Sequence, residues 1–173
     1  MKRKFSLFLL LSLFLISSAQ AKCNLEIYRF GSSYQAIQHQ LGDPLPVSVS
    51  TKNRLFMPGE LVCEHEKALV GSPILFIFFY DQLVQIRVTR YTLDGPEKPS
   101  LVSWAESIYG ERNNKPKSFY SDKPDASWYW DSSNALVRYF VESDGSGFRE
   151  HVIIESRRHQ KLFEKWANEN EAQ

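Results

Sequence analysis

A continuous apolar run in the middle of the chain, from Pro73 to Tyr80, constrains the fold most strongly. It is far too short to span a bilayer, which takes about 20 residues. Its Ile, Leu and Phe content is typical of a strand buried on both faces. An Asp81-Gln82 turn follows, and apolar and polar residues then alternate from 84 to 89. The sequence therefore predicts a β-hairpin whose second strand is half exposed.

The same order of elements is predicted on both sides of segment 94–99, which is rich in Gly, Pro and charged residues. Before it, Ser32 or Ser33 caps a helix that ends at Gly42, and a proline-containing loop leads to the hairpin. After it, a helix ending at Gly110 is followed by a second proline-containing loop and a second hairpin. The shared order predicts a tandem repeat, although identity between the two halves is very low.

The expected fold class is α+β. Two similar helix-plus-antiparallel-hairpin units, 22–95 and 96–173, form one continuous antiparallel sheet with helices packed on one face. The further elements that the patterns predict are a short strand around 25–27, a loop over 45–60 with a short strand at 47–49, a polar-faced strand over 61–67, strands over 127–130, 136–141 and 151–155, and a C-terminal helix around 162–166.

The N-terminus is typical of a cleavable secretory signal peptide. Basic residues at 2–4 precede an apolar stretch over 5–16, and Ala19-Gln20-Ala21 supplies small residues for cleavage before Lys22. The apolar stretch is too short for a membrane anchor, so we expect a periplasmic or secreted protein without stable membrane insertion. Removal of residues 1–21 changes the net charge from +1 to −2, which argues against a nucleic-acid partner.

Two cysteines, Cys23 and Cys63, remain in the exported chain. An oxidising compartment favours one disulfide between them. The pair lacks the C-x-x-C spacing of redox-active or metal-binding cysteines, so we interpret the bridge as structural.

The stretch from Phe30 through Ile37 to Leu41-Gly42-Asp43-Pro44 resembles the helix of small envelope proteins of the SmpA/OmlA type. The aromatic run Trp128-Tyr129-Trp130 and the hairpin from Leu136 to Ile154 look like the sheet of that family. Two such units in tandem would be similar to the β-lactamase inhibitor protein architecture. The sequence departs from these lipoproteins because it lacks a lipidation cysteine, and its second helix ends without the proline. The resemblance implies a non-catalytic, protein-binding scaffold.

The aromatic run offers the candidate binding residues. On a strand, Trp128 and Trp130 share one face and Tyr129 takes the other. The tryptophans either cover the helices of their own sheet, which we favour, or form a flat face that seats a partner. In the second case Trp128 and Trp130 make the contact, or Tyr129 makes it if the faces are reversed.

The sequence contains no clear catalytic or metal-binding motif. Glu64-His65-Glu66 suggests metal ligands, but alternation on a strand would point His65 away from its neighbours. No serine lies in the G-x-S-x-G motif of a hydrolase nucleophile, and no pair of carboxylates stands out as the catalytic pair of a glycoside hydrolase. We therefore expect no metal, no cofactor and no catalytic residue. The function that fits best is protein binding with another envelope protein as partner. The alternative is an envelope enzyme, or a carbohydrate or small-ligand binder, acting on cell-wall material.

Overall fold

The structure is a computed structural model that describes residues 22–42, 53–93, 100–112, 128–143 and 147–170. In these residues it has four α-helices and six strands. The α-helices are α1 (Tyr34–Gln40), α2 (Gly59–Val62), α3 (Ser100–Tyr109) and α4 (Gln160–Asn170). The strands are β1 (Arg54–Pro58), β2 (Pro73–Phe79), β3 (Gln82–Thr92), β4 (Trp128–Asp131), β5 (Ala135–Ser143) and β6 (Phe148–Ser156). Three short 3-10 helices are η2 (Leu25–Ile27), η3 (Lys67–Leu69) and η4 (Arg157–His159).

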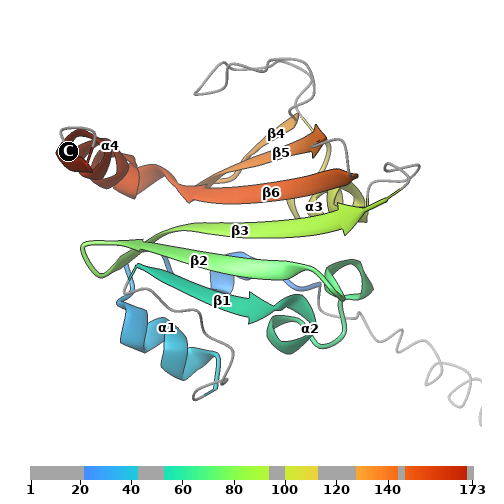
Figure 1. The fold of residues 1–173 in the computed structure, drawn as a ribbon, viewed down its shortest axis with the longest axis horizontal. Coiled ribbons are helices and arrows are strands. Elements are labelled where there is room, and N and C mark those ends of the chain that lie inside the picture. Colours follow the sequence, from blue (N-terminus) through green and yellow to red (C-terminus); the bar gives the residue numbers. More distant parts are fainter. Residues whose placement is uncertain (1–21, 43–52, 94–99, 113–127, 144–146, 171–173) are drawn as a thin grey trace, which may run out of the picture.

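The strands form one antiparallel sheet in the order β1-β2-β3-β6-β5-β4 (Figure 1). Each half of the chain supplies three neighbouring strands, and the halves meet where β3 pairs with β6. The predicted mixed α+β content and the single antiparallel sheet are therefore confirmed.

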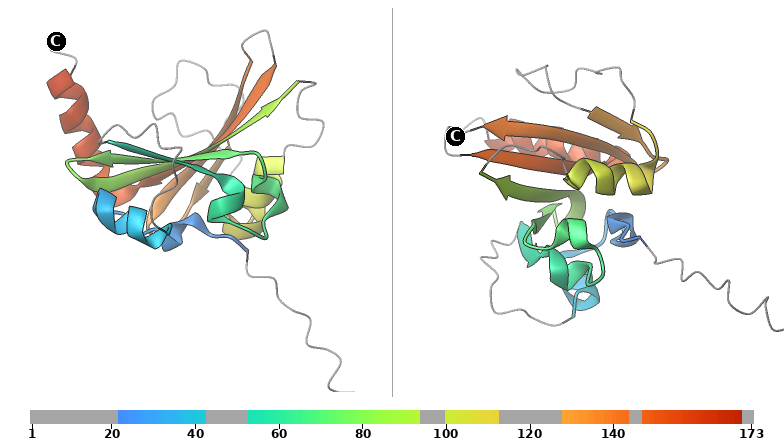
Figure 2. Two further views of the ribbon diagram at one scale, coloured as in Figure 1. Left: turned by 60° about the horizontal axis from the view of Figure 1, so that its bottom comes forward. Right: turned by 90° about the vertical axis from the view of Figure 1, so that its right-hand side faces the viewer.

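Helices α1, α2 and α3 lie against one face of the sheet, as the two views of Figure 2 show. Buried side chains from both halves of the sheet point toward these helices and form the core. The largest fully buried ones include Phe76, Phe78, Trp130 and Tyr139. Burial of this apolar area is the main stabilising contribution to the fold.

Capping residues explain where α1 lies. The Ser33 side chain accepts a hydrogen bond from the Ala36 amide at 3.2 Å, and Asp81 accepts one from the Tyr34 amide at 2.9 Å. Gly42 follows the helix with φ +79°, a conformation that favours glycine. The helix therefore begins and ends where its sequence predicts.

The hairpin of β2 and β3 is confirmed, with two differences. Its turn is Tyr80-Asp81, one residue earlier than expected, and both residues have positive φ, as a two-residue hairpin turn requires. Strand β2 is also not buried on both faces. Phe76 and Phe78 are buried under the helices, whereas Leu75 and Ile77 are only half-buried on the opposite face.

Three other local predictions are wrong. Residues 25–27 form η2 instead of a strand, because the Asn24 side chain caps them by accepting from the Glu26 amide. Residues 61–67 form no strand either, since α2 and η3 occupy this part of the chain. Conversely, β1 lies within the segment assigned to a loop. Its terminal Pro58 is tolerated because β1 is an edge strand.

Several predictions lie outside the described residues. These are the signal peptide over 1–21, the strand at 47–49, the boundary segment 94–99 and the proline-containing loop between α3 and β4. In the described ranges, no helix has the length and apolar character that crossing a membrane requires.

Candidate binding face

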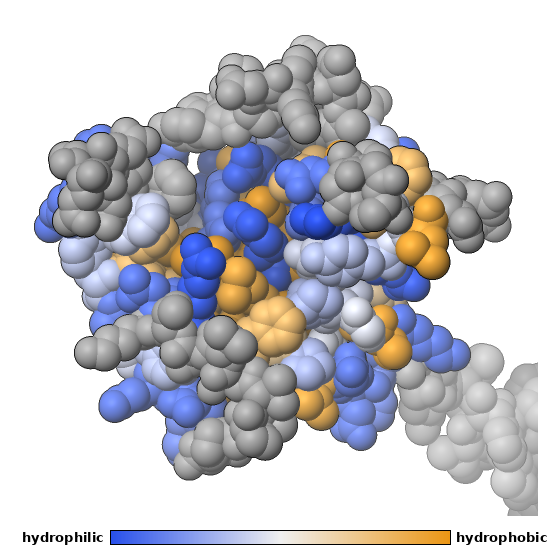
Figure 3. Space-filling model, viewed as in Figure 1, coloured by the Kyte–Doolittle hydropathy of each residue, from blue (hydrophilic) through white to orange (hydrophobic). Residues whose placement is uncertain are grey.

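The face of the sheet opposite α1, α2 and α3 is here called the open face. Helix α4 rises beside one end of it (Figure 2). All six strands contribute side chains to this face. Figure 3 shows apolar and charged residues lying next to one another there. The register places the following on this face: Arg54, Phe56, Leu75, Ile77, Gln85, Arg87, Thr89, Tyr91, Tyr129, Leu136, Arg138, Phe140, Glu142, Arg149, His151, Ile153 and Glu155.

The aromatic strand β4 divides its three candidate residues between the two faces. Trp130 is 1% exposed in the core, and its indole N–H donates to the Gly110 carbonyl at 2.9 Å. Trp128 points the same way and stacks on Tyr139, with ring centroids 5.0 Å apart. Tyr129 therefore belongs to the open face, in register with Arg138 of β5.

A polar network occupies the middle of the open face. The Glu155 carboxylate accepts hydrogen bonds from Arg138 at 2.6 Å and from Gln85 at 2.7 Å. Arg87 reaches the same network through a longer contact of 3.4 Å with the Gln85 amide oxygen. These four side chains come from β3, β5 and β6, so the network exists only when both halves of the sheet are joined.

His151 is the buried titratable group of this face. It is 7% exposed, its Nδ1 lies 3.1 Å from the Thr89 hydroxyl, and its ring stacks on Phe140. Its Nε2 lies 3.5 Å from the Glu142 carboxylate. Burial lowers the pKa of His151. Glu142 opposes this effect, whereas Arg87 and Arg149 add to it. The imidazole is therefore favoured in its neutral form.

Acidification is expected to destabilise the protein through His151. The unfolded chain takes up this proton at the ordinary pKa of 6.5, but the folded chain takes it up only at lower pH. Stability from this group is present above pH 6.5 and is lost as the pH falls toward the lowered pKa. We expect His151→Gln to reduce the fall in thermal midpoint between pH 7.5 and pH 5.5. Equal falls in both proteins would contradict this assignment.

Aromatic contacts join α4 to the end of the open face. Trp166 stacks on Phe79 of β2, with centroids 4.9 Å apart. Lys165 lies 4.6 Å from the centre of the Tyr80 ring, and the Tyr80 hydroxyl donates to Glu169. The predicted C-terminal helix thus exists, and its Trp166 packs on the sheet of the same chain.

A separate polar groove of about 530 Å³ lies where η2, the end of α3 and the β4–β5 turn meet. Its floor carries Glu26, which accepts a hydrogen bond from Ser132 at 3.3 Å, and Tyr109. Burial, with a smaller effect of Glu26, raises the pKa of Tyr109, so this phenol stays protonated at neutral pH. Asp131 at the rim is bound by Arg157. The groove can donate and accept hydrogen bonds.

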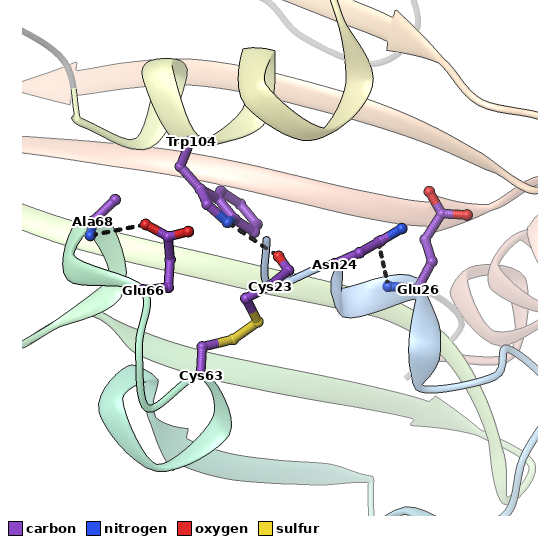
Figure 4. Close-up of a disulfide and its surroundings, with 7 residues drawn as sticks. All are labelled: Cys23, Asn24, Glu26, Cys63, Glu66, Ala68 and Trp104. Carbon is purple, nitrogen blue, oxygen red and sulfur yellow. Dashed lines mark hydrogen bonds between the residues drawn. A yellow bond between two sulfur atoms is a disulfide. The ribbon is translucent and has the colours of Figure 1, made fainter. Parts of the chain in front are cut away.

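The predicted disulfide is confirmed between Cys23 and Cys63, whose Cα atoms are 5.8 Å apart. It ties the segment before η2 to the residue that follows α2 (Figure 4). The indole N–H of Trp104 on α3 donates to the Cys23 carbonyl at 3.2 Å. The bridge is therefore part of the core between both halves, in keeping with a structural role.

The Glu64-His65-Glu66 segment lies in a turn before η3, not on a strand. Glu66 caps η3 by accepting from the Ala68 amide at 3.3 Å, and His65 is exposed. The alternation argument against a metal site was thus based on the wrong local structure. Within the described part of the chain, no three His, Cys, Asp or Glu side chains converge to hold a metal ion.

Comparison with known proteins gives no match, since no family model, no curated protein and no solved structure resembles this chain at a significant level. The function must therefore be argued from the geometry alone.

Sequence reasoning missed most of the open face. Alternation along β3 did indicate that Gln85, Arg87 and Thr89 point away from the core. It gave no signal that Glu155 and Arg138 lie beside them, because the sequence separation between Gln85 and Glu155 is 70 residues.

Proposed function

We propose that this chain is an exported, non-catalytic module that binds another envelope protein through its open face. One observation carries the proposal: three α-helices cover one face of a six-stranded sheet, while the other face carries exposed Phe56 and Tyr91 and half-buried Leu75 and Ile77. Uncovered apolar area rimmed by polar groups is typical of protein interaction sites.

Residues at two ends of the open face support this proposal. Phe56 on β1 is 38% exposed and Tyr91 on β3 is 63% exposed, both on the same face. Among the three aromatic candidates of β4, Tyr129 is the one on this face, but only 9% of it is exposed, so Phe56 and Tyr91 offer more surface to a partner. Large aromatic side chains are frequent anchors of protein interfaces.

We further propose that the chain consists of two related units, 22–95 and 96–173. The β1-β2-β3 and β4-β5-β6 groups occupy corresponding places on either side of the β3–β6 pair. A helix precedes each group, and the glycines after the two helices, Gly42 and Gly110, have nearly equal φ angles of +79° and +82°. This arrangement fits the tandem order of elements and the resemblance to envelope scaffolds.

Site-specific photo-crosslinking in the native host tests the binding proposal. A benzophenone amino acid replaces Phe56 or Tyr91 on the open face, and Leu61 or Ile27 on other surfaces as exposed controls. We expect a discrete crosslinked protein from the open-face positions and none from the controls. Adducts from the control positions alone, or none at all, would contradict the proposal.

The second candidate function is binding of a small polar ligand, such as a glycan fragment, in the groove around Glu26 and Tyr109. The clustered hydroxyl, amide and carboxylate groups beside a tyrosine ring favour this ligand class over an apolar one. If the open face gives no crosslink, the groove becomes the leading candidate site.

A further inference from the structure

The two arginines in the centre of the open face, Arg87 and Arg138, differ in how they pair with carboxylates of the described residues. Glu155 is the carboxylate of the central network, and the hydrogen bonds from Arg138 and Gln85 go to the same oxygen, Oε1. Arg87 has no carboxylate within salt-bridge distance among the described residues. Among the described residues, the Glu155 carboxylate therefore pairs with Arg138 and not with Arg87.

The second feature is that Arg87 is incompletely hydrogen-bonded. Its Nε atom is buried without a hydrogen-bond partner among the described residues, and the 3.4 Å contact with Gln85 is long. Burial lowers the pKa of Arg87. Glu155 and Glu142 oppose this effect, whereas Arg138 and Arg54 reinforce it. An arginine nevertheless stays protonated in proteins, so this charge persists without a close counter-ion.

Apolar residues surround this charge. The register places Leu75 of β2 and Ile153 of β6 directly beside Arg87, with Ile77 one pair further along β2. Ile153 is buried, whereas Leu75 and Ile77 are half-buried. A carboxylate that reaches Arg87 would therefore lie beside Leu75 and Ile77, where water is partly excluded and electrostatic attraction is stronger than in bulk solvent. Arg87 can offer such a carboxylate two parallel N–H donors.

We propose that Arg87 binds an acidic side chain of the partner protein, and that apolar residues flanking this acid pack on the half-buried Leu75 and Ile77 of β2. The inference rests on the proposed function and specifies the chemistry of its partner. The partner segment is extended and carries Asp or Glu between aliphatic or aromatic residues. Neighbouring strands are about 4.8 Å apart, so one short extended segment can reach both Arg87 on β3 and Leu75, its register partner on β2.

A displayed library of random twelve-residue peptides tests this proposal on the disulfide-bonded protein. We expect the wild-type protein to enrich peptides that carry an acid flanked by apolar residues. Synthetic versions should lose about tenfold in affinity or more with Arg87→Gln, because the mutation removes a charged hydrogen-bond donor from the interface. Arg158→Gln, an exposed cation outside the open face, is the matched control and should leave the affinity unchanged.

Three outcomes would overturn the inference. The first is that the enriched peptides carry no acid. The second is that the peptides bind the wild type and Arg87→Gln with equal affinity. The third is that no peptide is enriched and the protein binds only to vesicles of anionic phosphatidylglycerol. Thermal unfolding of Arg87→Gln shows whether the variant is folded, and Arg87→Lys provides a second variant that keeps the charge but loses the paired donors. If the open face still gives crosslinks in the host, these outcomes reject the acidic partner and leave the protein-binding function in place.

Discussion

Trp130→Ala is expected to lower the free energy of unfolding by about 3–5 kcal/mol, which is the usual cost of truncating a buried tryptophan. The side chain is 1% exposed, and the mutation also leaves the Gly110 carbonyl without its donor. Urea denaturation followed by circular dichroism measures the change. The result separates a core role of the β4 tryptophans from a binding role.

Phe56→Ala is the control for this prediction. Phe56 is an aromatic residue of the sheet that is 38% exposed on the open face. Because less of its area is removed from water, we expect a loss of about 1 kcal/mol or less. If Trp130→Ala kept the wild-type midpoint and lost the partner, Trp130 would be a contact residue and its position in the core would be incorrect.

Removal of the Cys23–Cys63 bridge is expected to cost about 4 kcal/mol. The cysteines are 40 residues apart, and on the chain-entropy model a closed loop of this size restricts the unfolded chain by about that amount. The comparison is between the wild-type protein and the Cys23→Ser, Cys63→Ser variant, by denaturant unfolding without reductant. A reductant should destabilise the wild type to a similar extent and leave the variant unchanged.

A loss below about 1 kcal/mol would contradict the role assigned to the bridge. The Trp104→Phe variant examines the surrounding packing independently, because it removes the indole donor to the Cys23 carbonyl and leaves the disulfide in place. If its destabilisation equalled that of the double serine variant, the packing around the bridge would account for the effect.

Predictions from sequence were accurate where a local cause decides the structure. Ser33 and Gly42 delimit α1, and alternation from 84 to 88 defines the faces of β3. They failed for short segments in which side-chain capping competes with alternation, as at Asn24 before η2. Strand β1 was missed because Pro46, Pro58 and Gly59 suggested a loop over 45–60, and pairing with β2 outweighs that local preference.

The candidate site was less predictable than the fold. The sequence did show that Trp128 and Trp130 share a face, but which face the helices cover depends on packing across the whole sheet. The network of Arg87 and Glu155 depends on the pairing of β3 with β6. These strands are far apart in the sequence, so no local pattern indicates that they pair. Long-range pairing of this kind is set by the global arrangement of the apolar faces.

The central position of the β3–β6 pair has a consequence for synthesis. Strand β3 is complete at Thr92, whereas its neighbour β6 begins only at Phe148. Until the ribosome has made β6, the β1-β2-β3 group presents β3 as an unpaired edge, which can pair with other chains. Early folding of the N-terminal half therefore carries an aggregation risk, and a factor that holds the nascent chain open until Ser156 has emerged would raise the yield of folded protein.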